Sequence, residues 1–255
     1  MLAKTESIAI VGTEARPVEI EVHVPGTGLP GFSVVGLPTA SVRESEHRCR
    51  SALAASGFAW PPGRVVANIA PGALRKEGTH FDLPLALAIL TANDLLPEAS
   101  LRGLLIMGEL ALDGSLRPVR GVLAGAIAAR EYDRGPFLCP RPNAAEAAIV
   151  EGLEVVAVSS LQECVDYLKG ELDPDPVEAV EQVHPEFDDL CEVRGHPQAK
   201  EALEIAAAGG HNLLLTGSPG SGKTMLARRL PGILPEMTLD EAFEVTRIRS
   251  VAGLL

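Results

Sequence analysis

Cysteine and aromatic residues are scarce in this sequence. Aromatic side chains make up 4% of its 255 residues. The four cysteines lie far apart with no CxxC pair, and the six histidines show no HExxH spacing. These absences argue against a disulfide framework and against the common zinc sites. We therefore expect a mostly aliphatic core and four reduced, buried thiols, at Cys49, Cys139, Cys164 and Cys191.

Long apolar segments are also missing. No run reaches the roughly 18–20 residues that are needed to span a bilayer. The N-terminus lacks the basic start and the apolar stretch of a signal peptide. A formal net charge of −12 argues against a wholly basic nucleic-acid-binding protein. We expect a cytoplasmic protein with no membrane partner.

Residues 1–170 have the pattern of a mixed α/β domain, in which strands and helices alternate. In Val18–Val24, apolar residues alternate with Glu and His, as in a strand with one solvent-exposed face. The segment Phe81–Leu90 is apolar nearly all round, which predicts a buried helix with Pro84 in its first turn. The last helix of this domain is predicted to end at Gly170.

A linker and the start of a second domain follow. Residues 171–192 hold nine acidic residues, three prolines and no basic residue, which is typical of an extended linker. We place a domain boundary there, so that residues 193–255 begin a second α/β domain. This domain is expected to contain a helix from Pro197, a short buried strand at Asn212–Gly217 and a helix from Lys223.

A glycine-rich segment carries the clearest chemical signal. GSPGSGKT matches the phosphate-loop pattern GxxxxGK[ST] in full and lies between the predicted strand and the predicted helix. Glycines let backbone N–H groups approach a polyphosphate without interference from Cβ atoms. Lys223 can reach the β- and γ-phosphates, and Thr224 can offer its hydroxyl to Mg²⁺. We therefore predict ATP and Mg²⁺ as cofactors, with contacts from Gly217, Ser218, Pro219, Gly220, Ser221, Gly222, Lys223 and Thr224.

Hydrolysis of ATP also needs an acidic residue at the end of a second strand. The acidic pair after the phosphate loop, Asp240–Glu241, follows no predicted strand. Thr238 and Glu241 instead have the spacing of a capping box at the start of a helix. No arginine finger or lid can be assigned either. We predict nucleotide binding with no catalytic residue in this chain, which we expect to end within the ATPase domain.

Six basic residues are concentrated in the middle third of the first domain. Glutamates lie between them, and the aromatic residues in their midst are limited to Phe58 and Trp60. This mixed patch leaves three interpretations open, namely a DNA-binding face, a solvated helix or a contact between subunits. The six residues are Arg43, Arg48, Arg50, Arg64, Arg75 and Lys76.

Polar residues just before the buried helix allow a catalytic interpretation. An acid at a helix start, however, stabilises the helix by about 1 kcal/mol as an N-cap. We therefore expect Asp82 to cap a helix that begins near Leu83, and His80 to form a hydrogen bond nearby. Lys76 and Thr79 could form a base and a nucleophile, but a lysine is more often a surface charge, as we expect for Lys76.

Three segments together resemble the ComM/YifB family of magnesium-chelatase-like AAA+ ATPases. They are GLPGFSVVGLPTASVRES, NIAPGALRKEGTHFDLPLALAIL and GHPQAKEALEIAAAGGHNLLLTGSPGSGKTMLARRLPGILP. Family members are longer, with the rest of the AAA+ core and a lid beyond the point where this chain stops. The resemblance implies a hexameric, ATP-binding ring that drives branch migration of DNA during recombination or transformation. It thus implies homo-oligomerisation and a DNA partner for the complete protein.

The N-terminal domain is similar to the Lon protease domain. Lon-type proteases use a serine and a lysine, and the resemblance places His80 at the serine position and Leu123 or its neighbours at the lysine position. A Ser–Lys dyad cannot work with both members replaced. We therefore expect a Lon-like domain without peptidase activity.

Two other functions remain open. The ATPase segment alone also permits a magnesium-chelatase-type ATPase that serves metal insertion into porphyrin, although chelatase ATPase subunits lack the Lon-like module. The N-terminal domain alone permits an inactive, protease-like binding module. Stimulation by porphyrin rather than by DNA would favour the first of these.

Overall fold

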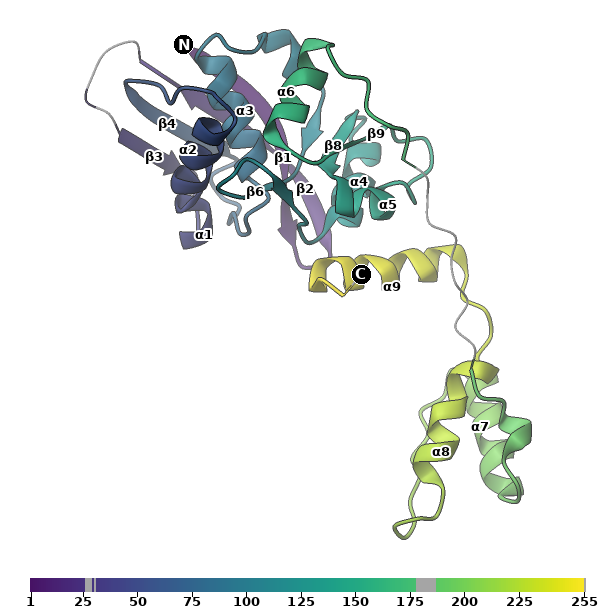
Figure 1. The fold of residues 1–255 in the computed structure, drawn as a ribbon. Helices are drawn as coiled ribbons and strands as arrows, with labels where there is room; N and C mark the ends of the chain where they lie inside the picture. Colours follow the sequence, from purple (N-terminus) through teal and green to yellow (C-terminus); the bar gives the residue numbers. More distant parts are fainter. Residues whose placement is uncertain (26–28, 30, 178–186, 255) are drawn as a thin grey trace. The chain divides into compact units, whose positions relative to one another are not determined.

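The computed structural model describes residues 1–25, 29, 31–177 and 187–254, and the chain divides into two compact units (Figure 1). The first unit comprises Met1–Val180 and Glu244–Leu255, and the second comprises Glu181–Phe243. Part of the expected linker, residues 178–186, lies outside the described residues. The domain bounds expected from the sequence stay a prediction.

The first unit contains a central sheet with helices on both faces. Its described strands are β1 (Leu2–Val11), β2 (Glu14–His23), β3 (Gly31–Val35), β4 (Arg64–Ala70), β5 (Leu105–Ile106), β8 (Phe137–Pro140) and β9 (Val155–Val158). They follow the order β3-β4-β2-β1-β5-β8-β9. The pairs β1–β2 and β2–β4 are antiparallel, and the other neighbours are parallel. The fold is therefore mixed α/β, as expected, and four of the six strand pairs of its central sheet are parallel.

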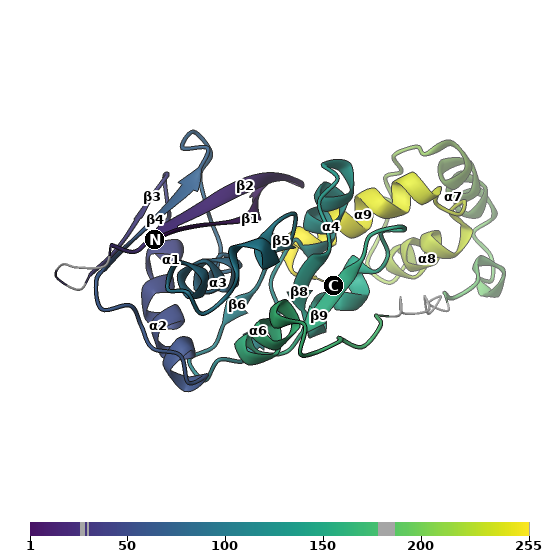
Figure 2. The same ribbon diagram turned by 90° about the horizontal axis from the view of Figure 1, so that it is seen from above.

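The helices of this unit connect these strands. They are α1 (Ala40–Arg43), α2 (Ser45–Ala55), α3 (Asp82–Ala92), α4 (Val122–Glu131), α5 (Ala144–Ala147) and α6 (Leu161–Lys169), with short 3₁₀ turns η1 (Glu98–Leu101) and η2 (Arg141–Asn143). A separate two-stranded antiparallel sheet pairs β6 (Glu109–Leu110) with β7 (Leu116–Arg117). In Figure 2, α2, α3 and α6 lie on one side of the central sheet and α4 lies on the other.

Alternating side chains divide the core into two layers. In β8, Leu138 packs with the cluster that contains α3, whereas Phe137 and Cys139 pack with the cluster that contains α4. In β9, Val156 joins the first cluster and Ala157 joins the second. Successive side chains of a strand point to opposite faces, so a sheet covered on both faces needs apolar residues at consecutive positions.

Several expected elements are confirmed. Val18, Ile20 and Val22 are buried in β2 while the residues between them are more exposed. Every residue of α3 is buried, with Pro84 in its first turn. Gly170 ends α6 in a left-handed conformation with φ of 73°, which glycine adopts without a Cβ clash.

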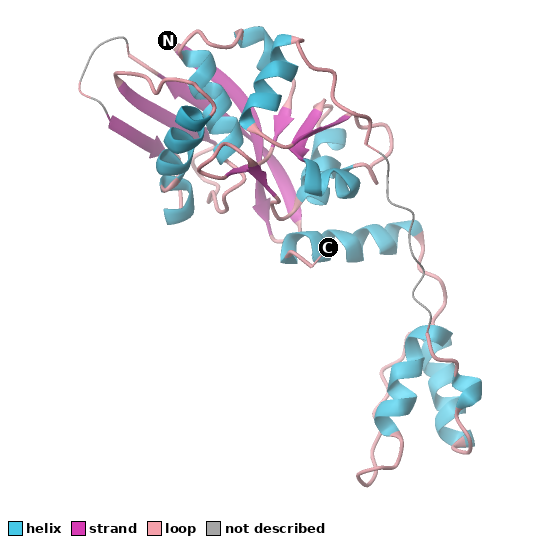
Figure 3. Ribbon diagram, viewed as in Figure 1, coloured by secondary structure: helices cyan, strands magenta, loops and turns pink. Residues whose placement is uncertain are grey.

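The second unit is small and mostly helical (Figure 3). It contains η3 (Leu190–Glu192), α7 (Pro197–Gly209), α8 (Lys223–Arg229), η4 (Leu230–Ile233) and the start of α9 (Leu239–Ala252). Leu190, Val193, Leu203 and Leu226 form its buried core. This core joins η3 and α7 to α8, the helix that follows the glycine-rich segment.

The strand predicted at Asn212–Gly217 is wrong for this structure, in which these residues form no strand. The apolar side chains that suggested burial are exposed, with Leu214 84% and Leu213 39% accessible. A strand forms only when a neighbouring strand accepts its backbone hydrogen bonds. The described residues of the second unit contain no such neighbour, and the apolar pattern alone could not reveal that.

The cysteine prediction holds for three of the four residues. Cys49, Cys139 and Cys164 are free and buried, and burial raises the pKa of the Cys139 thiol to about 12. Cys191 is exposed, which corrects the expectation of a fourth buried thiol. In η3 the neighbouring Leu190 fills the core instead, so the cysteine faces solvent.

Membrane-spanning helices and metal-binding clusters are considered for the described part of the chain alone. No helix there combines the length and the apolar character that a membrane crossing requires. Among the same residues, no group of three or more His, Cys, Asp or Glu side chains is placed to hold a metal ion.

Candidate phosphate-binding site

The glycine-rich segment forms the connection into α8 in the second unit. Gly222 precedes the helix with φ of 83°, a left-handed conformation that glycine adopts without strain. A Cβ on Gly217 would lie 2.9 Å from Ser221 Oγ, which is closer than real Cβ contacts. The left-handed φ therefore favours glycine at Gly222, whereas at Gly217 a Cβ would require the Ser221 hydroxyl to move.

Lys223 folds back along the same segment. Its Nζ donates hydrogen bonds to the carbonyl oxygens of Gly217, at 2.9 Å, and Ser218, at 2.8 Å. Ser221 Oγ lies 3.3 Å from the same nitrogen. The ammonium group is thus held at the loop by short contacts, and the loop is ordered around the cation that the motif assigns to phosphate.

Thr224 follows Lys223 in the first turn of α8 and is exposed. Among the described residues, no backbone acceptor is bonded to the N–H groups of Lys223 and Thr224. Such first-turn N–H groups have no partner within their own helix. The segment therefore presents free N–H donors, one ammonium and one hydroxyl close together, which is a chemistry suited to a phosphate group and its metal ion.

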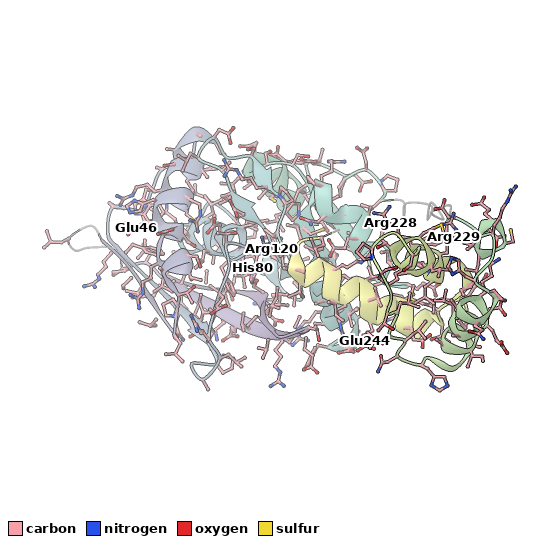
Figure 4. The ribbon with its side chains drawn as sticks, turned by 90° about the horizontal axis from the view of Figure 1, so that it is seen from below. Glu46, His80, Arg120, Arg228, Arg229 and Glu244 are labelled. Carbon is pink, nitrogen blue, oxygen red and sulfur yellow. The ribbon has the colours of Figure 1, made fainter. Side chains whose placement is uncertain are left out.

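Arg229 fixes the other end of α8, a contact that the sequence did not suggest (Figure 4). Its Nε donates to the carbonyl of Asp189 at 3.0 Å, and its Nη2 donates to Glu192 Oε2 at 3.2 Å. Asp188 Oδ2 lies 3.7 Å from Nη2. These acids belong to the segment that we expected to be linker. The indication in the sequence was that this acidic run comes just before a unit that carries the basic pair Arg228–Arg229.

The acidic pair after the loop is accounted for by the helix start. Thr238 N–H and Oγ1 both donate to Glu241 Oε2, at 2.8 and 2.9 Å, and Glu241 N–H lies 3.3 Å from Thr238 Oγ1. This is the reciprocal capping box predicted from the spacing. Glu241 is therefore engaged at the start of α9.

In the first unit, the structure places His80 away from solvent. Its Nε2 lies 2.9 Å from the carbonyl oxygen of Ile8, and burial lowers its pKa to about 4. The neutral ring therefore donates its Nε2–H to that carbonyl. Thr79 Oγ1 donates to Glu109, and a cavity of about 500 Å³ is lined by His80, Glu109 and Arg120, which lies beside His80 in Figure 4.

The expectation that Asp82 caps its helix is wrong. Asp82 is the first residue of α3, and the cap position, Phe81, has no side-chain hydrogen bond. The fully buried Asp82 carboxylate accepts from Arg48 Nε at 2.5 Å, from Arg48 Nη2 at 3.0 Å and from Leu110 N–H at 3.3 Å. Burial raises the pKa of Asp82, and the guanidinium opposes that rise. A buried charge in a wholly apolar helix requires a partner of opposite charge. That requirement could have predicted from the sequence that Asp82 pairs with a basic residue.

Lys76 is also placed differently from expectation. We expected a surface charge, but the residue is fully buried, and its Nζ donates to the backbone carbonyl of Pro71. Burial lowers the pKa of its ammonium group. The long aliphatic part of lysine can be buried when the nitrogen reaches an acceptor. Because Thr79 is bonded to Glu109, Lys76 and Thr79 do not form a base–nucleophile pair.

The buried histidine makes stability depend on pH. An unfolded histidine titrates near 6.5 whereas the folded His80 titrates at about 4, so between these values the unfolded chain binds more protons. Stability therefore falls as the pH falls through this window. From about pH 7.5 to about pH 5.5, we expect His80 to account for a loss of roughly 1.3 kcal/mol.

Urea unfolding followed by the fluorescence of Trp60, the single tryptophan, measures this loss in the first unit. His80→Gln keeps an N–H donor for the Ile8 carbonyl but does not titrate. We expect this variant to lose about 1.3 kcal/mol less than the unsubstituted chain between the two pH values. Equal losses in both proteins would contradict a buried, neutral His80.

The chain is thus a mixed α/β protein with a phosphate-loop motif in its second unit. Comparisons with known proteins show which family it belongs to. The family profile described as "Subunit ChlI of Mg-chelatase" matches residues 20–143. The profile described as "Magnesium chelatase, subunit ChlI" matches residues 189–255. The matches thus include four strands of the central sheet in full, β3, β4, β5 and β8, and the complete phosphate-loop segment.

Similar proteins extend these matches over nearly the whole chain. The competence protein ComM of Haemophilus influenzae is 43% identical over 98% of this chain and 50% of its own length. YifB of Escherichia coli is 41% identical over 96% of this chain and 48% of its own length. An uncharacterised protein of Mycobacterium tuberculosis is 43% identical over 100% of this chain and 50% of its own length.

The chain belongs to the ComM/YifB family of magnesium-chelatase-like proteins, an ATPase-like family. It spans about half the length of the curated relatives that it matches.

Proposed function

We propose that this chain is the nucleotide-binding portion of an ATP-dependent ring motor that acts on branched DNA. The observation that carries the proposal is the phosphate-loop segment, which has the full motif, left-handed glycines at Gly220 and Gly222 and Lys223 held at the loop. Membership in an ATPase-like family supports the same assignment.

The residues present fit Mg·ATP. The N–H groups and the ammonium of Lys223 would bind phosphate oxygens, and the exposed Thr224 hydroxyl would bind the metal ion. Bound Mg²⁺ neutralises phosphate charge when the nucleotide is in place. We assign no residue of this chain to activation of water, because Glu241 is engaged in the capping box. The chain on its own therefore binds nucleotide weakly and does not hydrolyse it.

Action on DNA and assembly into a hexameric ring are proposed for the complete protein from the family resemblance. The Haemophilus influenzae relative is named a competence protein, which supports this proposal. A second candidate is a magnesium-chelatase-type ATPase that serves metal insertion into a porphyrin. Both matching family profiles are described as Mg-chelatase subunits, which favours this candidate.

The two candidates differ in what stimulates ATP turnover. We would measure turnover with Mg²⁺ by the complete protein that contains this chain, alone, with four-way-junction DNA, and with porphyrin. The proposal predicts stimulation by the junction and none by porphyrin. Stimulation by porphyrin alone would contradict the DNA motor and support metal insertion. For residues 1–255 by themselves we expect no turnover in any condition, and Lys223-dependent turnover would place a catalytic acid within them.

A further inference from the structure

The structure separates the six basic residues of the first domain into two groups. In the first group, Arg48 is bonded to Asp82 and Arg75 Nε lies 2.7 Å from Glu77. Lys76 is fully buried on a backbone carbonyl. Arg48 and Lys76 are thus engaged inside the unit, and the charge of the exposed Arg75 is offset by its neighbour Glu77.

The second group consists of Arg43, Arg50 and Arg64, which are all exposed. Among the described residues, none of these three has a carboxylate partner within ion-pair distance. Arg43 and Arg50 lie seven positions apart on the nearly continuous α1–α2 segment, with the exposed His47 between them at helical spacing. They therefore lie on one face of that segment.

Two partly buried aromatic side chains lie next to Arg50. The Arg50 guanidinium lies 4.9 Å from the centre of the Trp60 ring, and the Phe32 ring lies 6.0 Å from Trp60 at an interplanar angle of 55°. Trp60 Nε1 is buried and has no hydrogen-bond partner among the described residues. Arg64 pairs with Gly31, the residue before Phe32, so its side chain lies on the face of the β3–β4 pair opposite Phe32. We call Phe32, Arg43, Arg50 and Trp60 the Arg50 patch.

Guanidinium groups without carboxylate partners attract phosphates, and aromatic rings next to them can stack on bases that are not paired. A duplex keeps its bases stacked inside and would use only the arginines. An acidic peptide would likewise use the charges and leave the rings unused. The combination of both groups in one patch fits a single strand best.

We propose that the Arg50 patch binds single-stranded nucleic acid. This inference rests on the proposed function, because a motor that acts on branched DNA exposes such strands. The sequence had shown a mixed patch with few aromatic residues nearby. The structure adds Phe32 from β3 and removes the cations that are already paired.

The single tryptophan of the chain reports on this patch directly. We would titrate the chain of residues 1–255 with an oligothymidylate of about 12 nucleotides and record Trp60 fluorescence. The proposal predicts saturable quenching. With two phosphate contacts, from Arg43 and Arg50, the logarithm of the binding constant should fall against the logarithm of salt concentration with a slope of about −1.4.

Two charge reversals separate the patch from general electrostatics. Arg50→Glu should weaken binding of a dye-labelled oligothymidylate at least tenfold, as measured by anisotropy. Arg102→Glu changes an exposed arginine that is paired with Glu98 outside the patch, and should leave binding within about twofold. Arg50→Ala, with an unchanged thermal transition, guards against a loss that is due to misfolding. Equal weakening by both reversals, or no quenching of Trp60, would overturn the proposal.

A polyglutamate competitor tests the other partner. If it displaces the oligonucleotide at equal charge concentration and quenches Trp60 equally, the patch is an acidic-peptide site and the proposal fails.

Failure of the patch proposal can be distinguished from failure of the motor proposal. Junction-stimulated turnover that survives Arg50→Glu, together with unchanged oligonucleotide binding, overturns the patch alone. Oligonucleotide binding at the patch without junction-stimulated turnover overturns the motor alone.

Discussion

Replacing Asp82 with alanine is expected to lower the free energy of unfolding of the first unit by about 3–5 kcal/mol, because it removes the buried carboxylate partner of Arg48 and leaves the guanidinium the exposed Glu44 carboxylate, 3.8 Å from Nη1. The Arg48 side chain is 18% accessible and the Asp82 side chain is 0% accessible, so solvent screens this pair little. Urea unfolding followed by Trp60 fluorescence reports on this unit alone, since the only tryptophan lies in it.

A matched double substitution serves as the control. Arg48→Met together with Asp82→Leu removes both charges and keeps similar volume, a change that is often neutral in proteins. We expect the double variant to recover at least half of the stability that Asp82→Ala loses, which gives a clear coupling between the two positions. If Asp82→Ala lowered the free energy of unfolding by less than about 1 kcal/mol, a strong stabilising role for the Arg48–Asp82 pair would be contradicted.

Replacing Lys223 with alanine in the complete protein is expected to lower ATP turnover by at least about 100-fold. Alanine removes the ammonium group that contacts the carbonyls of Gly217 and Ser218 and that we assign to the phosphates. The loss of turnover should be seen both with and without branched DNA, because phosphate binding by Lys223 precedes any effect of DNA on turnover.

Arg228→Ala is the matched control for charge. Arg228 is exposed on the same helix, five residues after Lys223, and its loss changes net charge by the same amount. We expect its turnover to stay within about threefold of the unsubstituted protein, since exposed charges away from a site have small effects. If both variants lost activity to the same extent, the role of Lys223 would be reduced to general electrostatics.

The sequence predicted well those features that depend on local pattern. The buried α3, the β2 alternation, the stop at Gly170 and the capping box at Thr238 are all confirmed. Each of them depends on residues within a few positions of one another, whose spacing fixes which face is buried or which N–H group is bonded.

Features that depend on distant partners were predicted poorly. Asp82 looked like a cap because its partner, Arg48, is 34 residues away in sequence. Lys76 looked exposed because its acceptor is a backbone carbonyl, which no side-chain pattern reveals. The run Asn212–Gly217 looked like a strand because its composition is apolar, but strand formation depends on a pairing partner.

The candidate site shows the same division. Glycine positions and the assignment of Lys223 to phosphate follow from the motif and stay predictions, and in the structure Lys223 Nζ donates to carbonyls of its own loop. The ties from Arg229 to Asp189 and Glu192 were not predicted, because they join α8 to a segment that composition alone describes as linker. Net charge describes a segment as a whole and does not show which of its acids is bonded.

Binding of Mg·ATP by the segment Gly217–Thr224 is tested by titrating residues 1–255 with a fluorescent ATP analogue in Mg²⁺. The unsubstituted chain, Lys223→Ala and Arg228→Ala are compared. We expect weak, saturable binding that Lys223→Ala abolishes and Arg228→Ala leaves unchanged. Absence of saturable binding, or equal binding by all three proteins, would contradict this expectation.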